Sequence, residues 1–133
     1  MSTSESNFLR TVIKENNIES YVFGVILMND MKSYSLEVAD NTIYTWGSPS
    51  GFNQAGIVTN DMGETLSPDG SSLNYLVNCN TISGNFLHGI KVTGNNEGGW
   101  FYHNTVNMAN DNMHTGMGFY NCEFPRIDNN IVC

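Results

Sequence analysis

The sequence predicts an all-β solenoid, a fold in which short strands wind into stacked coils. The first observation is a repeated phrase of an asparagine, a polar residue and an aliphatic residue, at residues 16–18, 41–43, 80–82, 104–106 and 129–131. The leading asparagines lie 25, 39, 24 and 25 residues apart, so one period recurs. The second observation is the composition: 20 Asn and 13 Gly with only 3 Pro favour tight bends between short strands over long helices. A repeat of this length is typical of solenoids.

The N-terminal segment is the least regular part of this pattern. The β-branched run at residues 11–13 favours a strand. A capping helix over residues 3–10 is the alternative, because serines near its start are suitable N-caps. We therefore divide the chain into an N-terminal segment or cap, residues 1–11, and a solenoid domain, residues 12–133.

Each period contains about three short strands separated by turns. One kind of strand starts with glycine and continues with aliphatic residues, at residues 24–27, 56–59, 89–92 and 116–119. Another leads into the asparagine phrase, at residues 35–38, 75–77 and 100–102. The phrase itself begins the third. Alternation of apolar and polar residues over such short runs indicates strands with one buried face.

When the periods are superimposed, like residues fall in columns. Two positions after each leading asparagine stand Ile18, Ile43, Ile82, Val106 and Ile131, and three positions before it stand Ile13, Val38, Val77 and Phe101. Stacked at the inter-strand spacing of roughly 4.8 Å, these columns form a core that no repeat could bury alone. The asparagines then form a hydrogen-bonded ladder, expected on the outer side of the bend. Ile127 precedes Asn129 by two residues rather than three, which predicts a bulge or a shortened turn there.

The 39-residue interval holds two insertions, at residues 48–54 and 60–72. Both are rich in Gly, Ser and Pro, which indicates surface loops. Long insertions on one coil of a solenoid usually project from one face and form the wall of a groove. The insertions are therefore the best positional indication of a binding site.

Charge and hydropathy disfavour several partners. The formal net charge is −8 with five Lys and Arg and no basic cluster, which disfavours nucleic acid and anionic membrane surfaces. The first residues lack the charged and apolar regions of a secretory signal, and no apolar run reaches 18 residues. We expect a soluble cytoplasmic protein or a chain that has lost a leader.

The three cysteines, Cys79, Cys122 and Cys133, show no metal-like spacing. Three buried thiols are the simpler expectation, and one disulfide with a free thiol is the alternative. The cysteines therefore leave the redox compartment open.

Residues 80–95 (NTISGNFLHGIKVTGN) and the phrases at 41–43 and 104–106 resemble the right-handed parallel β-helix proteins of the pectate-lyase-like superfamily. The resemblance covers most of residues 12–133 and implies a right-handed, single-stranded parallel β-helix of about five coils. The group includes polysaccharide lyases, glycoside hydrolases, epimerases, phage tailspikes and surface adhesins. It therefore implies carbohydrate as the ligand class and an extracellular or cell-surface location for the parent protein.

Two features depart from the pattern of these proteins. Five coils are fewer than their enzymes usually have, and Cys133 comes almost directly after a ladder phrase. An uncapped end would expose strand edges and apolar surface. We expect a fragment of a longer protein, or an assembly such as a homo-oligomer that covers the open end.

The residues before the leading asparagines provide one catalytic candidate pair. They are Glu15, Asp40, Cys79, His103 and Asp128. If this column faces outward, His103 and Asp128 lie one coil apart, at about 5 Å. Such a pair could transfer protons. A solvated polar edge is the alternative interpretation.

Two cations are catalytic candidates by residue type. Lys91 should face outward, between Val58 and Gly118 on the neighbouring coils. Lyases of the group that the chain resembles use a Lys or Arg to remove the proton beside a uronate carboxylate, which implies this role for Lys91 or Arg126. A solubilising surface lysine is the alternative.

Aromatic residues suggest a binding surface. Trp46 follows the second phrase, and Trp100 and Tyr102 precede the fourth. Because Phe101 belongs to an inward column, Trp100 and Tyr102 should face outward, where aromatic rings can stack on sugars. His114 is a further candidate for substrate binding.

A turn at residues 109–115 contains Asp111 and His114 among oxygen ligands suited to Ca²⁺. It lacks EF-hand spacing and the aspartate clusters of calcium-dependent pectate lyases. We therefore predict no cofactor, with a weak calcium site at Asp111 as the alternative. The paired aspartates of β-helix polygalacturonases are also missing, so Asp128 stands alone.

Two functions follow from these patterns. The first is a polysaccharide-binding or polysaccharide-processing protein, a lyase or glycoside hydrolase if it is catalytic. The second is a non-catalytic structural or adhesive module, such as part of a phage tailspike or surface protein. The sequence shows no complete catalytic signature, which favours the second function for this chain. The usual chemistry of the group that the chain resembles favours the first for its parent protein.

Overall fold

The computed structural model describes residues 11–28, 36–45, 54–60, 75–94, 96–97, 99–108, 115–123 and 125–133. Regular structure in these residues consists of sixteen β-strands. The predicted N-terminal cap before β1 (Thr11–Lys14) and most of both predicted insertions lie outside the described residues.

Three sheets of parallel strands are formed by strands from successive repeats. The first sheet has the order β1-β4-β7-β11-β15, with β4 at Leu36–Ala39, β7 at Leu76–Asn78, β11 at Trp100–Tyr102 and β15 at Arg126–Asp128. The second has the order β2-β5-β8-β12-β16, at Asn17–Ser20, Thr42–Thr45, Thr81–Gly84, Thr105–Met108 and Ile131–Val132. The third has the order β3-β6-β9-β13, at Phe23–Met28, Ala55–Asn60, His88–Thr93 and Thr115–Phe119. A small fourth sheet pairs β10 (Asn96–Glu97) with β14 (Cys122–Glu123).

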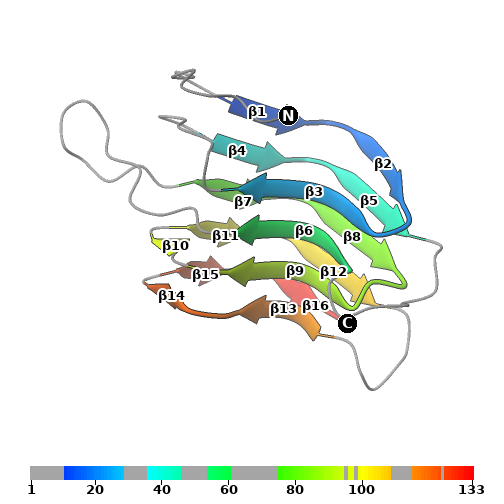
Figure 1. Ribbon diagram of the computed structural model, residues 1–133. Coiled ribbons are helices and arrows are strands. Elements are labelled where there is room, and N and C mark those ends of the chain that lie inside the picture. The colour runs from blue at the N-terminus through cyan, green and yellow to red at the C-terminus, as the bar shows by residue number, and fades with distance from the viewer. Residues whose placement is uncertain are drawn as a thin grey trace.

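The predicted all-β class is confirmed. In the part of the chain that the structure describes there is no helix, and every strand pair is parallel. Figure 1 shows the strands stacked from β1 at one end to β13, β15 and β16 at the other, an arrangement compatible with a parallel β-helix. Among the same residues, no helix is long and apolar enough to cross a membrane.

A corner column bends the chain between the first and second sheets. Its members are Glu15, Asp40, Cys79, His103 and Asn129, whose φ angles lie between 51° and 58°. This left-handed region is costly for most L-residues and is tolerated best by Asn, Asp and Gly. All five residues are exposed, so the corner column faces solvent.

The residue after each corner forms the asparagine ladder. In the middle of it, Asn80 Oδ1 accepts hydrogen bonds from the backbone N–H and Nδ2 of Asn41, at 3.1 and 3.0 Å. The N–H and Nδ2 of Asn80 donate to Asn104 Oδ1, at 3.1 and 2.9 Å, and Nδ2 also donates to Val38 O at 2.9 Å. The same bonds join Asn16, Asn41, Asn80, Asn104 and Asn130 in sequence.

The predicted hydrogen-bond network is thus confirmed, but its position differs from the expectation. Asn41, Asn80 and Asn104 are at most 1% exposed. The ladder therefore lies inside the bend, and the left-handed residue before it faces outward. Burial gives the ladder its structural value, because amide groups kept from water must find partners within the protein.

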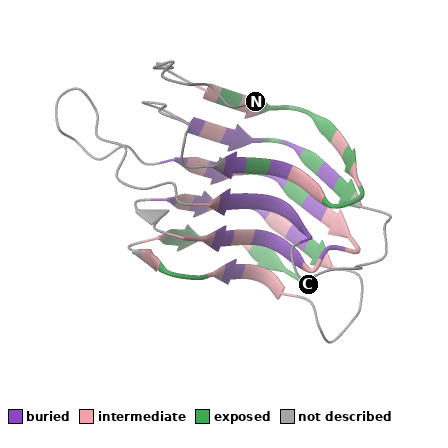
Figure 2. Cartoon of the chain, in the orientation of Figure 1, coloured by how far each residue is buried: buried purple, intermediate pink, exposed green. Residues whose placement is uncertain are grey.

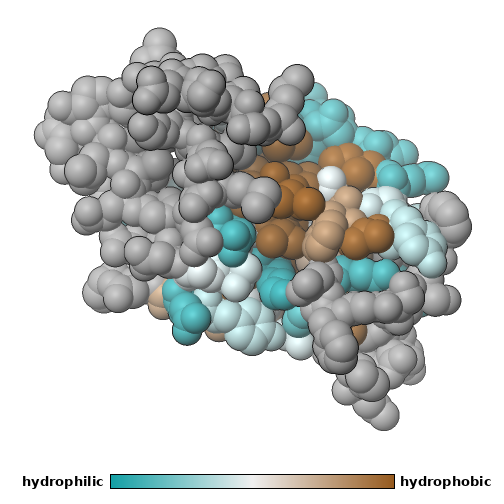
Figure 3. All heavy atoms as spheres, viewed as in Figure 1, coloured by the Kyte–Doolittle hydropathy of each residue, from teal (hydrophilic) through white to brown (hydrophobic). Residues whose placement is uncertain are grey.

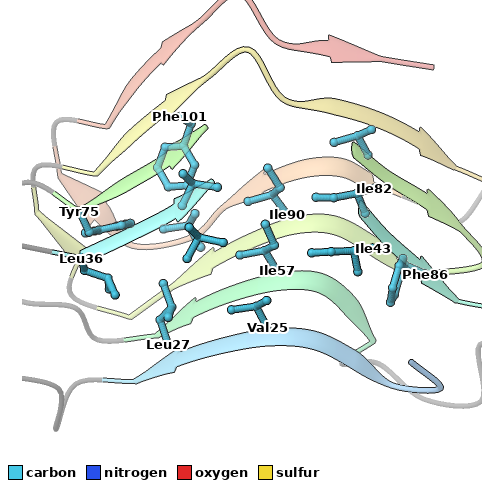
Figure 4. Close-up of a cluster of buried hydrophobic side chains, with 14 residues drawn as sticks. Val25, Leu27, Leu36, Ile43, Ile57, Tyr75, Ile82, Phe86, Ile90 and Phe101 are labelled. Carbon is cyan, nitrogen blue, oxygen red and sulfur yellow. The ribbon is translucent and has the colours of Figure 1, made fainter. Parts of the chain in front are cut away.

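The aliphatic columns form the core between the sheets. Val38, Val77 and Phe101 stack on the first sheet, and Ile43, Ile82 and Val106 stack on the second; all are fully buried. Figure 4 shows Phe101, Ile43 and Ile82 together with side chains of the third sheet, including Ile57 and Ile90, in one interior. Figure 2 shows the purple buried segments concentrated in the middle repeats. The ring of Phe101 meets Tyr75 and Phe119 edge to face, with centroids 5.8 and 5.2 Å apart.

The predicted irregularity of the fifth repeat is wrong. Ile127 pairs with Phe101, and Val132 pairs with Val106, so both columns continue in register. The ladder residue of this repeat is Asn130, not Asn129, and Val132 takes the column position predicted for Ile131. Because Ile127 is three residues before Asn130, no bulge is needed.

The glycine at the start of each strand of the third sheet has a packing role. A Cβ on Gly89 would lie 2.1 Å from Val106 Cγ1 and 2.6 Å from Gly116 O. The same holds at Gly56, where a Cβ would lie 2.4 Å from Ile82 Cγ2. Each glycine therefore makes room for the aliphatic residue that the next repeat supplies from the second sheet.

Candidate functional site

An exposed aromatic patch lies on the outer face of the first sheet, near its C-terminal end. We define it by Trp100, Tyr102, His103 and Arg126. The Trp100 and Tyr102 rings are edge to face, with centroids 5.7 Å apart, and the rings of Tyr102 and His103 are tilted at 6.4 Å. Both Trp100 and Tyr102 are half-buried. The patch therefore offers three adjacent rings on a rigid strand and its corner.

Strand alternation explains why these rings face outward. Phe101 between them is fully buried in the core, so its neighbours on β11 point to the opposite face. The expected direction of Trp100 and Tyr102 agrees with their half-buried state. His103 follows directly at the corner column, where the left-handed backbone turns its side chain to solvent.

Charged residues of β15 lie beside the aromatic ones. Arg126 pairs in register with Trp100, and Asp128 pairs with Tyr102. The Arg126 guanidinium carbon is 4.8 Å from the centroid of the Trp100 ring, a cation–π contact. The indole is thus covered by a planar cation that can also bind a carboxylate through two parallel hydrogen bonds.

The predicted pairing of His103 with Asp128 in one column is wrong. The register places Asn129 in the corner column beside His103, with Asn129 Nδ2 3.4 Å from His103 Nε2. Asp128 is one residue earlier, and only its backbone carbonyl meets His103, accepting the His103 N–H at 3.2 Å. Between these two described side chains there is no ion pair. The error follows from taking Asn129 instead of Asn130 as the ladder residue.

Lys91 lies apart from the aromatic patch. It is on β9 of the third sheet and pairs with Val58 and Gly118, the neighbours expected from the sequence. Arg126, the other cationic candidate, is on β15 of the first sheet. The structure therefore does not place the two cations on one strand or one sheet.

The sequence did not indicate one feature beside Lys91. The ring of Tyr120 covers Gly118, where a Cβ would lie 2.8 Å from Tyr120 Cε2, and it meets the His88 ring edge to face at 6.1 Å. Tyr120 is exposed and His88 is buried. The sequence feature that could have indicated this contact is Gly118 two residues before Tyr120, at the end of β13.

Figure 3, in the orientation of Figure 1, shows hydrophobic surface gathered near the centre with hydrophilic surface around it. Exposed apolar side chains on the described strands of the third sheet include Ile26, 46% exposed, beside Val58 and Lys91 in the same outward row. Single exposed aliphatic residues are common on protein surfaces. This row therefore adds less to the site than the aromatic patch does.

Three predicted site residues, Trp46, Asp111 and His114, lie outside the described residues. Within the described ranges, no group of three or more His, Cys, Asp and Glu side chains is arranged to hold a metal ion. The cysteines differ from the simpler expectation: Cys79 and Cys133 are exposed, Cys122 is half-buried, and all three are free thiols.

The surroundings of Lys14, beside the corner column, and of Cys122, which is half-buried, raise the pKa of each group. A hydrogen bond from the ammonium group to Asp40, helped by the charges of Asp40 and Glu15, raises the pKa of Lys14. The Nζ of Lys14 is 3.3 Å from Asp40 Oδ2. Burial raises the pKa of the Cys122 thiol, which keeps it protonated and weakly reactive.

Comparisons of the chain with protein-family models, with curated proteins and with solved structures find no match.

Proposed function

We propose that the protein is a carbohydrate-binding module built on a right-handed parallel β-helix of about five coils, of the pectate-lyase-like kind. Its proposed ligand is a polysaccharide that lies across the aromatic patch. The module acts without catalysis, as part of a surface or adhesive protein that works outside the cell.

The aromatic patch carries this proposal. Trp100 and Tyr102 are half-buried, adjacent and fixed on β11, with Phe101 anchored in the core between them. Aromatic faces bind the apolar C–H faces of sugar rings, and rigid side chains lose little conformational entropy on binding. Residues two apart on a strand are about 6.6 Å apart, so successive sugar units can meet separate rings.

Arg126 favours an acidic sugar chain. Its guanidinium lies over Trp100 at 4.8 Å, where a uronate carboxylate could accept two parallel hydrogen bonds from it while the sugar contacts the neighbouring ring. The formal net charge of the whole protein is −8, which weakens non-specific attraction of polyanions. Recognition of a uronate therefore depends on this local cation.

The placement of the catalytic candidates supports a binding role. A proton-transfer step needs an acid and a base within hydrogen-bond reach of one substrate atom. Lys91 is on the third sheet, Arg126 is on the first, and Asp128 does not pair with His103. The alternative, a polysaccharide lyase or glycoside hydrolase, needs at least one of these cations to meet a second acid–base group at the same substrate atom.

Titration of the protein with oligosaccharides, by tryptophan fluorescence and calorimetry, tests the binding role. We expect saturable binding that is tighter for uronate oligomers than for neutral oligomers of equal length. Trp100→Ala should weaken the binding of both kinds of oligomer about tenfold, and Arg126→Gln should weaken only the binding of uronate oligomers. Tyr44→Ala is the matched control, because Tyr44 is an exposed aromatic residue on the second sheet.

Equal losses from Tyr44→Ala and Trp100→Ala, or no saturable binding to any oligomer, would refute the site. The same panel should be followed for unsaturated products and new reducing ends. We expect neither to form. Turnover that disappears in His103→Ala or Lys91→Ala, with the fold retained, would instead establish the enzyme alternative.

A further inference from the structure

The asparagine ladder has a direction. In each step, the backbone N–H of one asparagine donates to Oδ1 of the asparagine in the following repeat, from Asn16 to Asn41 and onward to Asn130. The bonds therefore all point toward the C-terminal end of the stack. One end of the ladder must offer a donor and the other an acceptor.

The C-terminal end offers the donor. Asn130 Nδ2 donates to Phe101 O and Asp128 O, but among the described residues the Asn130 N–H has no acceptor. Beside it the inward columns end in Ile127 and Val132, which are 50% and 52% exposed although their partners Phe101 and Val106 are fully buried. The outer edges of β15 and β16 pair with no further described strand.

The N-terminal end offers the complement. Asn16 Oδ1 accepts no hydrogen bond from the described residues, although its Nδ2 donates to Lys14 O and to Asn41 Oδ1. Ile13 and Ile18 begin the two inward columns, and they are only partly buried against the core. β1 and β2 are likewise edge strands of their sheets, and their outer edges pair with no described strand.

We propose that copies of this chain associate head to tail, with β15 and β16 of one copy adding in parallel to β1 and β2 of the next. The columns then continue in register: Ile127 lies over Ile13 of the next copy, and Val132 lies over Ile18. The Asn130 N–H donates to Asn16 Oδ1 of the next copy, which satisfies both ladder ends in one contact.

Charge favours the same join. The outward column that ends in Asp128 begins with Lys14, through the pairing of Lys14 with Ala39, Ala39 with Asn78 and Asn78 with Tyr102. The carboxylate of Asp128 therefore meets the ammonium of Lys14 on the next copy. A tail-to-tail dimer would instead bring two Asp128 carboxylates and two Asn130 donors to one interface, which costs both charge repulsion and unpaired polar groups.

The third sheet limits the contact. It ends one strand earlier, at β13, so the contact between copies depends on the first two sheets. One strand position beside β13 stays unfilled. A head-to-tail contact uses different surfaces on the two copies and does not close on itself. We therefore expect a concentration-dependent series of oligomers rather than a single dimer.

Two end-blocked variants of the full chain test this proposal by sedimentation velocity. Ile127→Lys blocks the C-terminal end with a charge on an exposed column position. Val12→Arg with Asn17→Lys blocks the N-terminal end at two exposed outward residues. Val12 begins the column that ends in Arg126, so a cation at this position would face Arg126 of the other copy. Each variant alone should stay monomeric, whereas an equimolar mixture should form a one-to-one dimer, because each variant retains the end that the other lacks.

Tyr44→Lys is the matched control. Tyr44 is 43% exposed, against 50% for Ile127, but lies on β5, which is flanked by β2 and β8 and is not at either end of the stack. It should associate as the wild type does, and circular dichroism should show the same fold in all variants. A wild type that remains monomeric over the whole dilution series overturns the proposal. So does association that Ile127→Lys abolishes and the N-terminal variant leaves unchanged, which would show a tail-to-tail dimer.

Discussion

Removal of the Asn80 side chain should destabilise the protein strongly. This side chain makes four hydrogen bonds, two accepted from Asn41 and one donated to each of Val38 O and Asn104 Oδ1, all between 2.9 and 3.1 Å. At a net value of roughly 1 kcal/mol for each buried bond, Asn80→Ala should cost about 4 kcal/mol. The buried Asn41 N–H then has no acceptor, and the free-energy cost of this unpaired polar group keeps the total loss of stability near 4 kcal/mol rather than below it.

Asn16→Ala is the control, because it removes the same side chain at the exposed end of the ladder. There the side chain donates only to Lys14 O and Asn41 Oδ1, and water can replace both partners. The expected cost is about 1 kcal/mol. Urea unfolding at pH 7, followed by circular dichroism, measures both costs. Equal costs for the two variants, or a cost below about 1 kcal/mol for Asn80→Ala, would refute the reasoning.

Asn80→Asp separates hydrogen bonding from shape. The replaced Nδ2 would become a carboxylate oxygen facing Val38 O and Asn104 Oδ1, both acceptors. The folded state therefore favours the protonated acid and raises the pKa of the new carboxyl above its unfolded value of about 3.9. Since the folded state then binds more protons, the variant should be most stable below about pH 4 and lose stability as pH rises. A variant whose stability relative to the wild type is independent of pH would contradict this assignment.

Three further perturbations test the interior and the corners. Burial raises the pKa of Tyr75 to about 12, so stability should fall by roughly 2–3 kcal/mol as pH rises from 10 to 12, and Tyr75→Phe should remove this loss in urea titrations. Gly89→Ala places a Cβ 2.1 Å from Val106 Cγ1 and should cost about 3 kcal/mol, whereas Gly118→Ala meets only a movable tyrosine ring and should cost less than about 1 kcal/mol. Cys79→Asn should raise the free energy of unfolding by up to about 1 kcal/mol, and the urea midpoint with it, because Asn tolerates the left-handed corner better.

Each of these has an outcome that would contradict it. Parallel alkaline titration curves for wild type and Tyr75→Phe would show that the buried phenol is not the cause. Equal costs at Gly89 and Gly118 would show that the contact with Val106 is relieved elsewhere. A lower midpoint for Cys79→Asn would mean that the thiol makes a stabilising contact, although the described Cys79 side chain is exposed.

Much of the fold could be predicted because its determinants repeat. Ile43, Ile82 and Val106 occupy equivalent positions in three periods, and a residue that recurs at one spacing in a solenoid must face the same neighbour. The glycine-started strands were predictable as a set for the same reason. What spacing does not reveal is on which side of a bend a side chain lies, which is why the buried position of the ladder was missed.

The fifth repeat shows a second limit. Asn129 and Asn130 are adjacent and chemically identical, so the phrase alone cannot choose between them. The choice depends on two partners outside the phrase, Ile127 against Phe101 and Val132 against Val106, which both require Asn130. The one-residue error pairs His103 with Asp128, whereas the observed register places Asn129 beside His103. The contact of Arg126 with Trp100 occurs in one repeat only, so a comparison of the repeats cannot predict it. Only the three-dimensional register shows this contact.

The long interval between the second and third repeats has a consequence for how the protein can vary. Asn41 and Asn80 are 39 residues apart, yet their ladder bonds of 3.0 and 3.1 Å match those of Asn80 and Asn104, which are 24 residues apart. Loop-closure entropy grows only with the logarithm of length, so the longer connection costs about 0.4 kcal/mol more. About a tenth of the roughly 4 kcal/mol expected for the Asn80 side chain is enough to offset this entropic cost. The stack can therefore accept new loop sequence at this step without weakening the coils on either side.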